Sequence, residues 1–142
     1  MLKFNDKFFG FSLIEALVAV AVLLIGILAV SVAFPLSLKV SQSAEQATIA
    51  ANLAQAKIEE IFQSGYDNLN IGDIEAKHRL AETSADPFYY YQRETEVEYI
   101  DSNLNHSETE TGMKKITVTV YWYSSALNAE KNMSLTIIMS RK

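Results

Sequence analysis

A run of almost uninterrupted apolar residues extends from Phe11 to Phe34, close to the beginning of the printed sequence. Within this run, residues 16–30 contain no charged or strongly polar side chain. A helix of roughly 24 residues is about 36 Å long, whereas the hydrocarbon core of a membrane is about 30 Å thick. The pattern therefore predicts a helix that spans a membrane.

The apolar run continues into a helical period instead of a loop. Small and apolar residues recur in alternating steps of four and three, so that they share one face of a continuing helix. They are Val40, Ala44, Ala47, Ala51, Ala54, Ile58 and Ile61, opposite a polar face of Ser41, Gln42, Glu45, Gln46, Gln55, Lys57 and Glu59. We expect Ile58, Ile61 and Phe62 to enter a core and Gly65 to end the helix.

The last part of the chain changes to a period of two, which is typical of half-buried strands. Apolar and polar residues alternate after Phe88, again in Lys115–Tyr123, and again in Ser134–Met139. Residues 66–87 lack a clear period and predict a loop with room for one short element. The predicted fold class is α+β, with one long N-terminal helix packed on a C-terminal antiparallel sheet of about three to four strands.

Length and charge narrow the function classes. The chain has 142 residues, a net charge of -5 and no cysteine. Behind the apolar helix there is room for one small domain, and none for a second, catalytic domain. An acidic chain lacks the basic face that nucleic-acid binding normally needs, and disulfides cannot stabilise this protein.

Two residues at the start of the apolar run stand out. Gly10 directly precedes the run, so a cut after Gly10 would remove a leader that carries Lys3 and Lys7 and leave the apolar helix in place. A secretory signal peptide has the opposite order, because its small-residue cleavage site follows its apolar core. Glu15 lies inside the run, where an unpaired carboxylate costs several kcal/mol. Either Glu15 reaches water at the membrane surface or a partner satisfies its charge.

The segment Gly10-Phe-Ser-Leu-Ile-Glu15, followed by the apolar helix, resembles the prepilin signature of type IV pilins and type II secretion pseudopilins. This motif is specific because it needs glycine, an aromatic residue, serine or threonine, two apolar residues and glutamate in fixed order. Residues 16–26, Lys115–Trp122 and Ser134–Met139 are most similar to minor pilins of the PilV kind. A long helix covered by an antiparallel sheet is the pilin architecture, so the resemblance implies the same fold as the residue pattern.

The resemblance implies that a prepilin peptidase cleaves between Gly10 and Phe11 and methylates the new amino terminus of Phe11. It also implies that Glu15 neutralises the terminal amine of a neighbouring subunit, and pairing cancels much of the cost of two separate charges in lipid. Gly26 has no side chain and Pro35 has no amide donor, so both are expected to be points of kinking or flexibility in the helix.

The predicted domains are a leader peptide (residues 1–10), a transmembrane and filament-core helix that we call the stem (11–39), and a head of amphipathic helix and sheet (40–142). The predicted protein is a structural, minor subunit of a type IV pilus or pilus-like filament, held in the inner membrane by a single span with its head in the periplasm or outside. Expected partners are other pilin subunits, prepilin peptidase, the inner-membrane assembly platform and membrane lipid. The alternatives are a type II secretion pseudopilin, a filament-tip adhesin or DNA-uptake receptor, and a single-pass membrane protein outside any filament.

Candidate chemistry in the head is sparse. The sequence has two histidines and none of the common nucleophile, phosphate-loop or zinc motifs, so we expect no enzyme activity, no cofactor and no metal. Asp101–Asn105 resembles the start of a calcium loop, but His106 stands where such a loop needs glycine and Gly112 where it needs glutamate. A solvated hairpin loop is the favoured interpretation, and an irregular site that uses Glu108 and Glu110 stays open.

Two aromatic clusters, residues 88–91 and 121–123, could stack on nucleic-acid bases or sugars. Stacking on single strands also needs basic neighbours, and Arg93 is the only one in residues 88–101, among several glutamates. Aromatic residues on strands more often form core and subunit contacts. We therefore expect no nucleic-acid partner, with DNA capture as the alternative.

Overall fold

The computed structural model describes residues 10–124, 126 and 128–141. The chain divides into two compact units, Met1–Lys39 and Val40–Lys142. The first half of the helix α1 (Leu13–Ser64) belongs to the first unit, and its second half belongs to the second unit. Gly65 follows with a φ of 79°, the left-handed conformation that glycine adopts easily after a helix. The predicted long helix and its end are confirmed.

In the first unit, residues 16–30 of α1 are apolar around the whole circumference of the helix. The most apolar 18-residue window has a mean hydropathy of 3.0, and none of it is buried. Leu17 and Leu24, for example, are both more than half exposed. The Ser31 hydroxyl donates to the Ile27 carbonyl at 2.8 Å, so this polar group is satisfied within the helix. By length and composition, this helix is able to cross a membrane.

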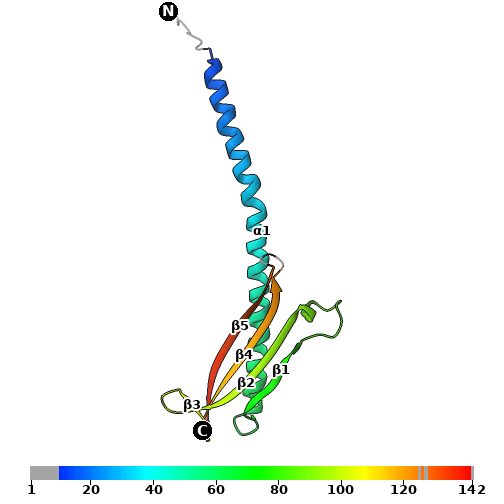
Figure 1. Ribbon diagram of the computed structural model, residues 1–142, viewed down its shortest axis with the longest axis vertical. Helices are drawn as coiled ribbons and strands as arrows, with labels where there is room; N and C mark the ends of the chain where they lie inside the picture. The colour runs from blue at the N-terminus through cyan, green and yellow to red at the C-terminus, as the bar shows by residue number, and fades with distance from the viewer. Residues whose placement is uncertain (1–9, 125, 127, 142) are drawn as a thin grey trace, which may run out of the picture. The chain divides into compact units, whose positions relative to one another are not determined.

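The second unit contains a five-stranded antiparallel sheet and the second half of α1 (Figure 1). The strands are β1 (Gly72–Arg79), β2 (Tyr91–Ile100), β3 (His106–Ser107), β4 (Met113–Ser124) and β5 (Ala129–Ser140), and a 3-10 helix, η1 (Pro87–Tyr90), precedes β2. The strand order is β1-β2-β4-β5, and the short β3 pairs with the end of β2. The edges of the sheet are therefore β1 and β5.

The core of the head lies between α1 and the inner face of the sheet. Ala50 and Ala54 of α1 have no exposed surface, and their small side chains let the helix lie close to the strands. The sheet contributes alternate residues, as the period of two predicts. Its buried residues include Tyr91, Thr95, Val97, Ile116, Val118, Val120, Trp122 and Met139. The predicted α+β, pilin-like architecture is confirmed.

The packed face of α1 differs from the predicted face at both ends. Val40 and Ala44 are exposed, because Ala47 is the first residue of α1 that packs against the core. Phe62 is 52 % exposed instead of entering the core. Successive residues of a helix point about 100° apart, so Phe62 faces away from the sheet when Ile61 faces toward it.

The largest difference from the prediction is β1, which lies in the segment expected to be mainly loop. β1 does not alternate, because it is an edge strand with two register irregularities against β2, at Asp73/Glu75 and at Glu75/His78. Residues 88–90 were expected in a strand but form η1 instead. There the Asp86 carboxylate accepts a hydrogen bond from the Phe88 N–H at 2.8 Å, and Pro87 supplies a backbone angle suited to a helical turn.

A buried lysine holds the segment that follows α1. Lys114 lies in the inward-facing row of β4 and is only 4 % exposed. Its Nζ donates to the carbonyl oxygens of Tyr66 at 2.8 Å and Leu69 at 2.6 Å, and it lies over the Tyr66 ring. Burial lowers the pKa of Lys114, because an ammonium group is costly to remove from water. The two carbonyl contacts offset part of this cost.

Candidate functional site

The predicted processing site lies just before α1. Gly10 and Phe11 are both exposed and non-helical, with 76 % of Phe11 accessible. The helix then begins with the Ser12 carbonyl, which accepts the N–H groups of Glu15 at 3.0 Å and Ala16 at 3.1 Å. The bond between Gly10 and Phe11 is thus not protected by helical hydrogen bonding. The rest of the predicted leader, with Lys3 and Lys7, lies outside the described residues.

Glu15 is exposed in the first turn of α1. A carboxylate near a helix N-terminus is favoured by the partial positive charge of the free N–H groups there. Among the described residues, no lysine, arginine or histidine lies within ion-pair distance of Glu15. Its predicted partner, the amine of a neighbouring subunit, therefore stays a prediction.

Gly26 and Pro35 both lie inside α1, and the backbone keeps its helical assignment through both residues. A Cβ atom added at Gly26 would meet no other atom within 4 Å, so this glycine is not required by packing within the chain. Pro35 cannot donate the hydrogen bond that a helical residue normally makes. A kink or flexible point at these positions stays a prediction.

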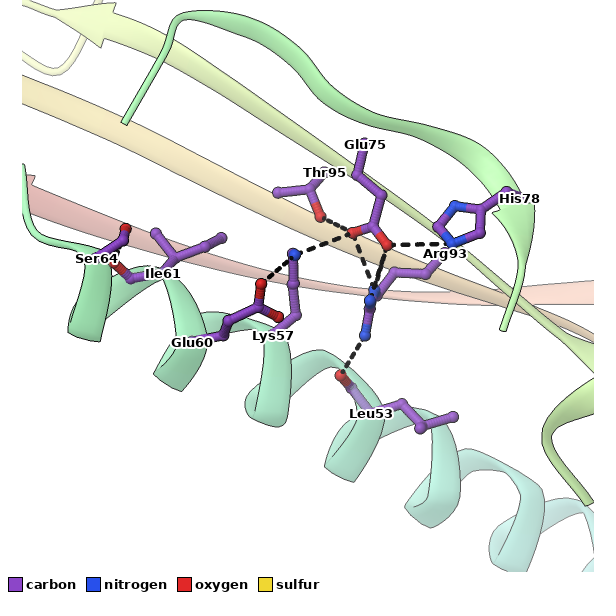
Figure 2. Close-up of polar contacts among 9 residues, drawn as sticks. All are labelled: Leu53, Lys57, Glu60, Ile61, Ser64, Glu75, His78, Arg93 and Thr95. Atoms are coloured by element: carbon purple, nitrogen blue, oxygen red, sulfur yellow. Dashed lines mark hydrogen bonds and ion pairs between the residues drawn. The ribbon is translucent and has the colours of Figure 1, made fainter. Parts of the chain in front are cut away.

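A cluster of ionised side chains lies between α1 and the sheet of the head (Figure 2). Arg93 of β2 donates through Nε and Nη2 to both carboxylate oxygens of Glu75 in β1, with distances of 2.8 to 3.1 Å. Thr95 donates to the same carboxylate at 2.8 Å, and Lys57 of α1 lies 4.0 Å from it. Arg93 also reaches back to the Leu53 carbonyl of α1 at 3.5 Å. The cluster therefore ties β1, β2 and α1 together.

The charge state of this cluster follows from its surroundings. Burial by itself raises the pKa of Glu75, but hydrogen bonds from Arg93 and Thr95, together with the charges of Arg93 and Lys57, outweigh it and lower the pKa. The side chains of Glu75 and Arg93 are only 11 % and 15 % exposed. Glu75 is thus held as a carboxylate, and the paired geometry gives the cluster a structural role.

The sequence did not reveal this cluster, although it held one signal. Arg93 occupies the inward-facing row of β2, between Tyr91 and Thr95, where an unpaired charge would be costly. From the sequence alone, Arg93 is a candidate basic neighbour for base stacking on the aromatic residues. In the structure it is committed to Glu75 instead, so it does not supply a cation for base stacking.

The two aromatic clusters divide between core and surface. Tyr91 and Trp122 are buried, whereas Tyr90 and Tyr123 are 62 % and 52 % exposed. Tyr121 donates to Glu94, and this hydrogen bond raises the pKa of Tyr121 to about 12. The clusters therefore provide both core residues and an exposed surface.

The loop that resembles a calcium site forms a turn. One carboxylate oxygen of Asp101 accepts the N–H groups of Asn103 at 2.8 Å and Asn105 at 2.9 Å. Glu110 pairs with Arg141 at 2.8 Å. In the part of the chain that the structure describes, no group of three or more His, Cys, Asp or Glu side chains is arranged to hold a metal ion. These contacts support the interpretation of a hairpin loop.

Residues 6–31 match the family model of the prokaryotic N-terminal methylation motif. Comparison with curated proteins and with solved structures gave no significant match. The matched segment covers Gly10, Phe11 and Glu15 and continues into the apolar first half of α1. Together with the pilin-like architecture, the motif supports a processed subunit of the type IV pilin and pseudopilin class, with a helix suited to membrane anchoring.

We expect Glu75→Gln to lower the free energy of unfolding of the head by about 2 kcal/mol, because Arg93 loses a charged acceptor in a mostly buried position. Urea unfolding of the full-length protein in detergent micelles measures this. The fluorescence of buried Trp122, the single tryptophan, reports on the head. Glu96→Gln, on the exposed face of β2, is the matched control and should change stability by less than about 0.5 kcal/mol. Equal effects of the two variants would contradict the role of the cluster.

The stability that Glu75 contributes should depend on pH. Because its pKa is lowered in the folded head, the contribution is fully present above the ordinary value of 4.5 and is lost as the pH falls through the lowered value. The difference in unfolding free energy between the unmodified protein and Glu75→Gln should therefore be largest near about pH 7 and shrink below about pH 4.5. Urea titrations over this range measure the difference, and a gap that stays constant down to about pH 3 would argue against the assignment.

Proposed function

We propose that the protein is a minor structural subunit of a type IV pilus or a related filament, and that it is not an enzyme. The match of residues 6–31 to the methylation motif carries this proposal. An apolar helix follows the motif, and it suits lipid before assembly and a bundle of helices afterwards. The resemblance of β4 and β5 to sheets of the PilV kind favours a minor subunit.

In this proposal, prepilin peptidase cleaves between Gly10 and Phe11 and methylates Phe11. The exposed, non-helical backbone at these residues supports access of the peptidase. The stem then keeps the subunit in the inner membrane until the assembly platform moves it into the filament. The head lies in the periplasm or outside the cell.

Glu15 sets the position of one subunit against the next. A carboxylate and an amine are each costly in lipid, and they offset one another when they pair. Such a pair forms only at one axial offset between neighbouring stems. In the proposed filament, Glu15 pairs with the methylated amine of a neighbouring subunit and so fixes the stagger of the helices.

A type II secretion pseudopilin shares the motif and the apolar helix, so the same observations support that variant of the proposal. A filament-tip adhesin or DNA-uptake receptor is the second candidate function, favoured by the exposed rings of Tyr90 and Tyr123. DNA capture has less support than adhesion, because Arg93 is paired with Glu75 and the chain is acidic.

The mature N-terminus tests the proposal directly. In cells with an active prepilin peptidase, mass spectrometry should find a protein that begins at methylated Phe11. Gly10→Leu should leave a heavier protein that retains the leader, because the bulky residue blocks cleavage. Gly26→Leu, a glycine in open space within α1, is the control and should be processed normally. Retention of Met1–Gly10 by the unmodified protein would overturn the proposed function.

Glu15→Val should permit cleavage and still impair assembly, because the neighbouring amine loses its partner. We expect at least a roughly tenfold lower amount in sheared filaments relative to membranes, the effect of losing about 1.4 kcal/mol. Immunoblots of both fractions measure this ratio. Leu17→Val, an apolar exchange in the same part of α1, should assemble normally. Normal incorporation of Glu15→Val would refute the role of Glu15.

A further inference from the structure

The two edges of the sheet differ in how well they are protected from other chains. β1 has eight residues and two register irregularities against β2. It also carries five ionisable side chains, namely Asp73, Glu75, Lys77, His78 and Arg79. Bulges and charges are features by which proteins keep an edge strand from pairing with a further strand. The β1 edge is therefore protected.

The β5 edge has no bulge, and its charges are confined to Glu130 and Lys131 at its start. β5 pairs with β4 at every position from Ala129 to Ser140 without a register shift. It contains no proline, and residues 132–140 carry no charge. Within the described residues, β4 is the one strand that pairs with β5 (Figure 1). One side of a regular twelve-residue strand thus has no strand partner for its backbone groups.

A groove of about 630 Å³ lies beside the end of this edge. Phe62 of α1 and Ile138 of β5 both line it, and they are 52 % and 44 % exposed. α1 covers the inner face of the sheet, whereas Ile138 belongs to the exposed row of β5, so a groove that both line lies at the free edge. Arg141 also lines the groove, but it is already paired with Asp67 and Glu110. The groove therefore offers apolar contact at Phe62 and Ile138 beside a polar part formed by the paired Asp67 and Arg141.

We propose that the free edge of β5 accepts an extended strand from the head of another filament subunit. Only another extended main chain offers N–H and C=O groups at the spacing that β5 leaves unpaired. The partner strand carries no charge opposite residues 132–140, because a charge there would be desolvated without a partner. It places an apolar side chain in the groove beside Phe62 and Ile138. This inference rests on the proposed filament function.

A second copy of this chain fits the edge less well than a different subunit does. The β1 edge of a second copy is bulged and charged, so it does not match a long regular strand. The β5 edge of a second copy would form a symmetric pair, and such a pair closes on itself and cannot continue along a filament. The inferred occupant is therefore a different subunit that has a regular, uncharged edge of its own.

Amide hydrogen exchange read by mass spectrometry tests the inference. The full-length protein in detergent micelles is compared with the same protein in membranes and filaments from cells that make the complete set of subunits. Peptides from residues 132–140 should exchange at least about tenfold more slowly in the assembled material. Peptides from residues 72–79, in the bulged and charged β1 edge, are the internal control and should exchange at similar rates in all samples.

A pair of variants tests the same edge by mutation. Thr136 of β5 and Thr117 of β4 are partners in the sheet, and their hydroxyl groups lie 3.4 Å apart. Thr136→Lys puts a charge on the edge strand, and Thr117→Lys puts the same charge one strand further in. We expect Thr136→Lys to lower the amount in filaments at least about fivefold and Thr117→Lys to change it less than about twofold. Unchanged Trp122 fluorescence in micelles confirms that each variant is folded.

The outcomes separate the inference from the proposed function. Equal incorporation of the two variants, or unchanged exchange of residues 132–140 in both membranes and filaments, overturns the strand pairing even if the mature protein begins at Phe11. A protein that is absent from filaments but protected at β5 in membranes contradicts the filament role and retains the pairing. Protection that appears in micelles as the protein concentration rises indicates a second copy and overturns the choice of partner.

Discussion

The structure depends on one helix that meets two different surroundings. Residues 16–30 of α1 are apolar on every side, whereas the second half of the helix has one small-residue face, with Ala50 and Ala54, against the sheet. Alanine permits close approach but buries little apolar area. Polar contacts add to this packing, because Arg93 reaches the Leu53 carbonyl and Lys114 holds the carbonyl groups that follow the helix. The sheet is thus attached to α1 and to the segment after it by side-chain to backbone bonds as well as by the core.

The elements that depend on local chain geometry could be predicted from the sequence. The end of α1 followed from Gly65, and the strands β2, β4 and β5 followed from alternation, because each signal lies in consecutive residues. β1 could not be predicted as a defined strand, since its two irregularities break the alternation and its side chains are mostly polar. The prediction that Phe62 enters the core was wrong, because the buried face of the helix includes Ile61 and does not extend to Phe62.

The candidate site likewise contains residues that a contiguous motif reveals and residues that only the folded sheet brings together. Gly10, Phe11 and Glu15 could be named from the sequence because the prepilin motif is contiguous, and the family match covers all three. The ion pair of Glu75 and Arg93 joins residues that are 18 positions apart on neighbouring strands, and register between strands is not readable from one sequence. A charged residue in an inward-facing row was the only local sign of it.

The hairpin of β4 and β5 has a consequence for the order of folding. Its strands are joined by a connection of only a few residues and pair in unbroken register, so its contacts are close in sequence. Contacts of this kind form fastest, because little chain entropy is lost in closing a short loop. A hairpin that forms early gives β2 a template, and β1 and the helix can join afterwards. In the proposed membrane-anchored subunit, the head can thus begin to fold from its C-terminal end while the first half of α1 is still held in lipid.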